Sequence, residues 1–79
     1  MANDRLPAVS GKHVVAALER AGFYIERTAG SHYLLVHRTN STRAVTVPVH
    51  GNRDLAPGTL RSIIRQAGMT VKEFADRLK

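Results

Sequence analysis

His32 is the residue of this chain whose type and position raise the question of chemistry. It follows a glycine–serine pair at the start of an apolar run, in the stretch GSHYLLVHR of residues 30–38. A histidine side chain titrates near neutral pH and can take up or release a proton during a reaction. An imidazole in this place either transfers protons or is only a solvated side chain at the end of a strand. The residue type alone leaves both interpretations open.

Most other kinds of site lack the residues they need. The histidines are spread over a helix, a strand and a loop in the prediction, and no pair has the i, i+4 spacing of a zinc hydrolase helix. The six carboxylates are scattered, and the chain has no cysteine, so no thiolate can bind a metal or act as a nucleophile. Neither a glycine-rich phosphate loop nor a G-x-S-x-G motif is present. We therefore predict no metal site and no cofactor.

The charge of the chain indicates a polyanionic partner. Twelve Lys and Arg against six Asp and Glu give a net charge of +6, and nine of the twelve cations are arginine. The planar guanidinium group fits phosphate better than an ammonium group does, which favours nucleic acid over a membrane surface. RNA also supplies its own nucleophile, because the ribose 2′-hydroxyl can attack the neighbouring phosphorus once a base removes its proton. The alternative is a basic surface that only keeps the protein in solution.

An amphipathic helix is predicted in the stretch SGKHVVAALERAG, beginning at Ser10. Its apolar positions recur at the i, i+4 and i+7 spacing of one helix face: Val14, Leu18 and Ala21. Ser10 can cap the start of this helix, and Gly22 can adopt the left-handed conformation that closes its end. Lys12 lies in the first turn, where it either helps the free N–H groups to bind an anion or is simply solvated.

Three short strands are predicted next, separated by turn-forming residues of the kind found in hairpins: residues 23–28, 32–38 and 43–49. In the first strand, Phe23 and Ile25 are expected on the same, buried face. The third strand is expected at an edge of the sheet, because Pro48 cannot donate a hydrogen bond to a neighbour.

The middle strand is apolar on both faces. Leu34 and Val36 point to one side, and Tyr33 and Leu35 point to the other. Helices on one side of the sheet would leave part of the second face exposed, and exposed apolar area marks an interface. The alternative is that strand curvature or a bulge accounts for the second apolar face.

Two more helices complete the order α-β-β-β-α-α. Pro57 is well placed at the first position of a helix whose core-facing stripe comprises Leu60, Ile63, Ile64 and Ala67. Arg61 and Arg65 share another face of that helix, and Thr70 with Glu73 forms a capping box for a short last helix. We predict a single domain over residues 1–79 with an ordered core from about residue 10, and a modest core for so short a chain.

The sequence also predicts the compartment. The amino-terminal stretch MANDRLPAVSGK lacks an apolar run of signal-peptide length, and no run of apolar residues is long enough to cross a membrane. The absence of cysteine fits a reducing environment. We expect a cytoplasmic protein without membrane association.

These stretches together resemble a known family. GSHYLLVHR, followed by VTVPVHGNRDLAPGTLRSIIRQAGMTVKEF, resembles the HicA toxins of bacterial type II toxin–antitoxin systems, and SGKHVVAALERAGF resembles their first helix. The resemblance covers nearly the whole chain from Ser10 onward. It implies an α+β fold like that of double-stranded-RNA-binding domains, with a three-stranded antiparallel sheet packed on helices. It also implies an endoribonuclease, an mRNA interferase, that acts on mRNA and is inhibited by a HicB-type antitoxin.

The resemblance implies that His32, the histidine after the glycine–serine pair, is the catalytic residue. Many members of the family have a second histidine directly after it, where this chain has Tyr33. If the reaction needs a second proton-transfer group, His37 and His50 are candidates by chemistry. For RNA binding we predict Lys12, Ser31, His50, Arg61 and Arg65, and the alternative for the cations is a solvated basic face.

Two other functions remain to be weighed against a ribonuclease. The first is a non-catalytic RNA-binding module on the same fold, which would read the shape of RNA and leave it intact. The second, a DNA-binding protein, is weakened by the lack of a recognisable helix-turn-helix. The fate of RNA in the presence of the protein separates the first of these from the ribonuclease.

Overall fold

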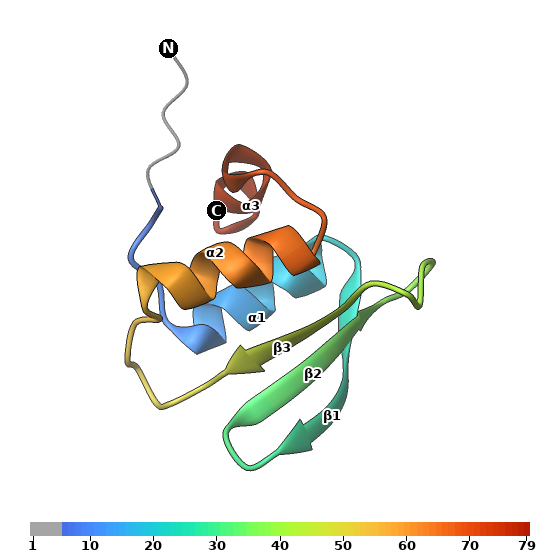
Figure 1. Ribbon diagram of the computed structural model, residues 1–79, viewed down its shortest axis with the longest axis horizontal. Helices are drawn as coiled ribbons and strands as arrows, with labels where there is room; N and C mark the ends of the chain where they lie inside the picture. Colours follow the sequence, from blue (N-terminus) through green and yellow to red (C-terminus); the bar gives the residue numbers. More distant parts are fainter. Residues whose placement is uncertain (1–5) are drawn as a thin grey trace.

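Three helices and three strands make up the structure, a computed structural model that describes residues 6–79. In chain order they are α1 (Gly11–Arg20), β1 (Phe23–Ala29), β2 (His32–His37), β3 (Ala44–Pro48), α2 (Pro57–Gln66) and α3 (Val71–Arg77). The strands form one antiparallel sheet in the order β1-β2-β3. The helices lie on one side of this sheet (Figure 1). The predicted α+β arrangement, like that of a double-stranded-RNA-binding domain, is therefore confirmed, while residues 1–5 of the predicted domain lie outside the described part.

Local signals in the sequence set the ends of the helices. The Ser10 hydroxyl accepts a hydrogen bond from the His13 backbone N–H at 3.4 Å, and Gly22, just after α1, has a φ of 101°. At α3, the Thr70 hydroxyl and the Glu73 carboxylate each accept a hydrogen bond from the other residue's backbone N–H. Both predicted caps and the predicted capping box are confirmed. Each of them satisfies backbone groups that a helix end leaves unpaired.

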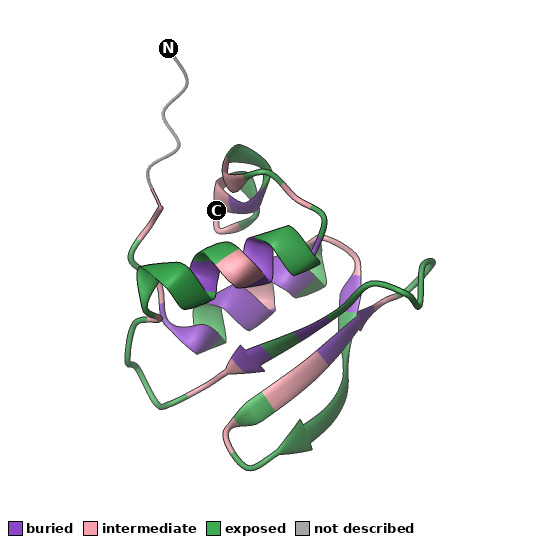
Figure 2. Cartoon of the chain, in the orientation of Figure 1, coloured by how far each residue is buried: buried purple, intermediate pink, exposed green. Residues whose placement is uncertain are grey.

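The core lies between the sheet and the helices. In β3, Val45 and Val47 are fully buried and Thr46 is exposed, which is the alternation expected for an edge strand with one face on the core. The predicted stripe of α2 packs into the same cluster, and so does Phe74 of α3. In Figure 2 the buried segments of α1 and α2 accordingly face the sheet.

The prediction for the buried face of β1 is wrong at one position. Phe23 is buried at 2% exposure, whereas Ile25 is 38% exposed. The register between β1 and β2 shifts between Ile25 and Arg27, so β1 contains a bulge at this point. A bulge bends a strand and increases its twist. Because of this, β1 leaves the helices after its first residues and Ile25 lacks a covering partner.

For the second face of β2 the sequence left open an exposed apolar interface or a face covered through curvature or a bulge, and each applies in part. Val36 is 6% exposed although it is not part of the core cluster, and it lies opposite Tyr24 in the β1–β2 ladder. Tyr24 itself is 38% exposed, with the Arg38 guanidinium 5.9 Å from its ring centroid. Leu34 is half-buried. Cross-strand neighbours thus cover part of this surface, and the bulge curves it, but an apolar strip remains accessible.

A close approach joins the start of α1 to the end of β3. Gly11 is buried, and a Cβ atom placed on it would overlap the Pro48 carbonyl oxygen and come within 3.0 Å of the Val49 Cα. Only a residue without a side chain fits here. Gly11 therefore allows the first turn of α1 to sit directly against the carboxyl end of β3.

Candidate active site

His32 is the first residue of β2, and its side chain is exposed. The turn that precedes it contains Gly30 at a φ of 60°, a left-handed conformation that glycine adopts without strain. Across the sheet His32 pairs with Ala29 of β1 and Pro48 of β3. The glycine–serine turn thus places the imidazole at the end of the central strand and open to solvent.

The structure places His50 next to His32. The centroids of the two imidazole rings are 6.4 Å apart, and the ring planes are at 83°. His50 follows Pro48 by two residues, and Val49 between them donates its N–H to the Ser31 carbonyl oxygen at 2.6 Å. The pairing of β2 with β3 therefore continues past the strand ends and brings the second histidine alongside the first.

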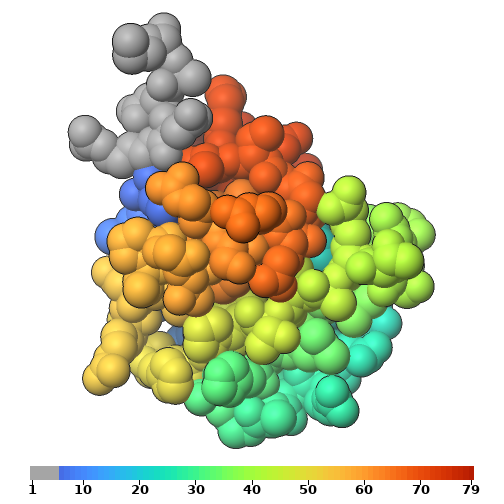
Figure 3. All heavy atoms as spheres, viewed as in Figure 1, coloured from blue at the N-terminus to red at the C-terminus, as the bar shows by residue number. Residues whose placement is uncertain are grey.

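The loop of residues 50–56, which begins with His50, is held at several points. Within the loop, the Arg53 N–H donates to the His50 carbonyl oxygen at 3.1 Å. At its far end, the Leu55 N–H donates to the Val9 carbonyl oxygen at 2.9 Å, and Asp54 forms a β-bridge with Ser10. In Figure 3 this yellow-gold loop meets the green β1–β2 turn at the molecular surface. His50 is exposed but belongs to a segment tied to two other parts of the chain.

Ser31 lies at the same end of the sheet, and Lys12 lies in the first turn of α1, which packs against that end. Lys12 is exposed and directly follows Gly11, which packs on Pro48. Ser31 is half-buried and accepts the hydrogen bond from Val49. We call the four residues Lys12, Ser31, His32 and His50 the histidine edge. Its residues come from the start of α1, the β1–β2 turn and the loop after β3, which lie toward the same, lower-left side of the molecule in Figure 1.

Arg61 and Arg65 lie on another part of the surface. Both are exposed on α2 and line a shallow groove together with Ile64, Met69, Thr70 and Val71. This groove follows the junction of α2 and α3. The predicted RNA-binding residues thus divide between the histidine edge and the groove beside α2.

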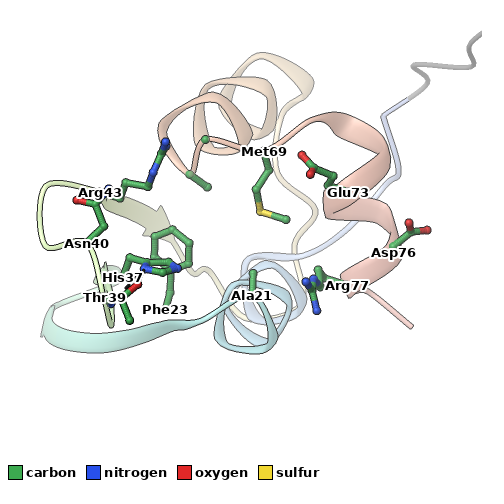
Figure 4. Close-up of a pocket in the computed structure, with 12 residues that line it drawn as sticks. Ala21, Phe23, His37, Thr39, Asn40, Arg43, Met69, Glu73, Asp76 and Arg77 are labelled. Carbon is green, nitrogen blue, oxygen red and sulfur yellow. Dashed lines mark hydrogen bonds between the residues drawn. The ribbon is translucent and has the colours of Figure 1, made fainter.

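His37 occupies the opposite end of β2. It lies five positions after His32 along the extended strand, a distance of roughly 16 Å. Its ring packs edge-on against Phe23, with centroids 5.0 Å apart, and its Nδ1 accepts a hydrogen bond from the Thr39 N–H at 3.2 Å. It also lines a cavity of about 540 Å³, where Figure 4 shows it beside Phe23 and opposite Glu73 and Arg77 of α3. His37 is therefore part of the packing at that end of the sheet.

His13 and the acidic residues add no further site. His13 is exposed on α1, with its Nδ1 2.9 Å from the Ser10 hydroxyl oxygen. Among residues 6–79, no three histidine, aspartate or glutamate side chains gather closely enough to hold a metal ion. Within the same residues, every helix is too short or too polar to span a membrane.

The histidine edge combines two exposed imidazoles with a lysine on a protein of net charge +6. An imidazole can act as a base in its neutral form and as an acid in its protonated form. A nearby cation can stabilise negative charge that develops on a phosphate. The arrangement therefore has the groups needed for proton transfer on a bound polyanion.

Comparison with known proteins identifies the family. A search of curated proteins gives no match. Residues 11–69, which are more than half of the chain, match the family model described as HicA toxin of bacterial toxin-antitoxin. The matched region contains the whole histidine edge and extends from the start of α1 to the end of α2. This chain belongs to the HicA toxin family, the toxins of bacterial toxin–antitoxin systems.

Proposed function

We propose that this HicA family toxin is an endoribonuclease, an mRNA interferase, that cleaves mRNA in the cytoplasm with His32 in acid–base catalysis. The observation that carries the proposal is the position of His32, exposed at the start of the central strand on a basic protein with a double-stranded-RNA-binding fold. At this position the imidazole can reach a bound backbone without disturbing the core.

The reaction uses the 2′-hydroxyl of RNA as the nucleophile. Its oxygen attacks the adjacent phosphorus while its proton moves to a base, and the bond from phosphorus to the 5′-oxygen breaks. The products are a 2′,3′-cyclic phosphate and a free 5′-hydroxyl. His32 takes part in one of the two proton transfers, and a positioned acid or base of this kind contributes about 10²- to 10⁴-fold to a rate.

The RNA backbone is held by the cations on the two parts of the surface. Ser31 adjoins His32 in the chain, and Lys12 lies in the first turn of α1, which packs on the end of β3, while Arg61 and Arg65 are exposed on a separate part of α2. Contacts of Lys and Arg with phosphate release counterions, so the affinity for RNA falls steeply with salt. Such contacts carry little sequence information, and they suit a fold that recognises RNA by shape.

Cleavage is expected to continue in an excess of chelator. The nucleophile belongs to the RNA and the proton moves to an imidazole, so neither step needs a bound metal ion. The measurement is the rate at which the purified protein cuts a labelled RNA in EDTA and in magnesium. A rate that disappears in EDTA and returns with magnesium would contradict the proposal. RNA that is bound but stays intact under both conditions would favour the non-catalytic RNA-binding module.

We also propose a HicB-type antitoxin as the protein partner, bound over His32 or on the apolar strip of the sheet that contains Tyr24 and Leu34. Co-expression with the antitoxin is expected to remove toxicity and to raise the yield of soluble protein. The substitution Tyr24→Glu distinguishes the two locations, because it weakens co-purification only if the strip is covered. A harmless protein obtained in full yield on its own would argue against such a partner.

A further inference from the structure

We propose that His50 is the second proton-transfer group of the reaction and acts on the opposite side of the scissile phosphate from His32. This inference rests on the proposed RNA cleavage. It assigns the second proton-transfer group that Tyr33 does not provide, and it selects His50 from the two candidates, His37 and His50, that the sequence left open.

The chemistry requires two transfers in opposite directions. One imidazole accepts the proton of the 2′-hydroxyl while the bond from its oxygen to phosphorus forms. The other imidazole, already protonated, donates a proton to the 5′-oxygen while that oxygen leaves phosphorus. The pair loses one proton and gains one, so no other reactant is needed. Without the donor, the 5′-oxygen would have to leave as an alkoxide.

The distance between the rings fits this arrangement. The attacking and the leaving oxygen stand on opposite sides of one phosphorus atom. Each proton transfer requires about 2.6–3.2 Å between the imidazole nitrogen and its oxygen. Centroids 6.4 Å apart, with both imidazoles exposed, allow one phosphate group to lie against the two rings and to be reached by both.

The backbone holds the two histidines in fixed positions relative to each other. His32 pairs with Pro48, and the hydrogen bond from Val49 to Ser31 continues the same ladder up to His50. The loop after His50 is anchored to Val9 and Ser10. A pair positioned in this way avoids the entropy loss of ordering a mobile group at the moment of reaction.

The other histidines do not have this geometry. His37 lies at the far end of β2 and packs against Phe23. His13 contacts the Ser10 hydroxyl on α1. His50 is thus the histidine whose ring stands beside that of His32.

The test compares His50→Ala and His50→Gln with wild type, and uses His13→Ala as a control that removes an exposed histidine outside the pair. Cleavage of a labelled RNA is expected to fall about 10²-fold or more in kcat for both His50 variants, with little change in KM. Melting temperature and binding of the same RNA with 2′-deoxy residues are expected to stay close to wild type. His13→Ala is expected to cleave at the wild-type rate.

A second substrate tests proton transfer directly. In this RNA, sulfur replaces the bridging 5′-oxygen, and a thiolate leaves without being protonated. Between His32→Ala and His50→Ala, one variant is expected to recover a near-wild-type rate on this substrate, and the other to remain slow. The variant that recovers has lost the general acid, and the one that stays slow has lost the base.

Each contrary outcome has a distinct meaning. Near-wild-type cleavage by His50→Ala overturns the inference and leaves the proposed ribonuclease intact. An equal defect on both substrates for both variants, a loss confined to KM, or loss of folding in both His50 variants also overturns it, because His50 would then bind RNA or support the loop. A wild-type protein that leaves RNA uncut overturns the proposed function itself.

Discussion

His32→Ala is expected to lower the rate of RNA cleavage by about 10²-fold or more, with the fold and the affinity for RNA unchanged. The side chain is exposed at the end of a strand, so its removal should change the free energy of unfolding by no more than about 0.5 kcal/mol. Binding should persist because it depends on contacts of lysine and arginine with phosphate. The measurement pairs cleavage of a labelled RNA with binding of the same RNA carrying 2′-deoxy residues, at one salt concentration.

His13→Ala provides the matched control for this variant, since it also removes an exposed histidine. If His32→Ala cuts RNA at a near-wild-type rate, the mechanism proposed for this toxin is wrong. If it neither cuts, binds nor folds, then His32 is a structural residue and the assignment of a catalytic role loses its support.

Gly11→Ala is expected to destabilise the protein by about 1–3 kcal/mol. On helix propensity alone, alanine should stabilise a helical position by about 1 kcal/mol relative to glycine. The added Cβ, however, would overlap the Pro48 carbonyl oxygen, and that backbone is held by the pairing of Pro48 with His32. The clash therefore decides the sign. The free energy of unfolding is measured by urea denaturation.

Gly58→Ala is the matched control, because Gly58 is also in a helix and a Cβ there would meet open space. This variant is expected to be neutral or more stable by about 0.4–1 kcal/mol. Gly11→Ala should also slow RNA cleavage. Only the fraction of the protein that remains folded is active, and the substitution pushes α1 away from the strand end that leads to His50. Equal stability of the two variants would show that the approach of α1 to β3 is looser than described.

The elements of the fold could be predicted because their signals are local. Ser10, Pro57 and the Thr70–Glu73 capping box each act within one turn of a helix, and they mark the helix starts correctly. The exposure of Ile25 could not be predicted, because the bulge after it depends on how β1 bends relative to the helices. Periodicity assigns a residue to a face but does not say how far the opposing layer extends.

The candidate site was predictable only in part, for a related reason. The glycine–serine turn and the resemblance to HicA toxins single out His32 within one short stretch. The proximity of His50 depends on the register between β2 and β3, and it could have been anticipated only by counting back from the turn that joins them. Arg61 and Arg65 were correctly expected on an exposed face of α2, but helical spacing carries no information on their distance from His32.

The anchoring of the loop to Val9 and Ser10 determines when the histidine edge can assemble while the ribosome synthesises the chain. His32 emerges early, but the histidine edge closes only when Asp54 and Leu55 have been synthesised and have paired with residues near the amino terminus. The core that supports it also needs Phe74 of α3. A nascent chain therefore lacks the assembled histidine edge until α3 has been synthesised, however early His32 itself has emerged.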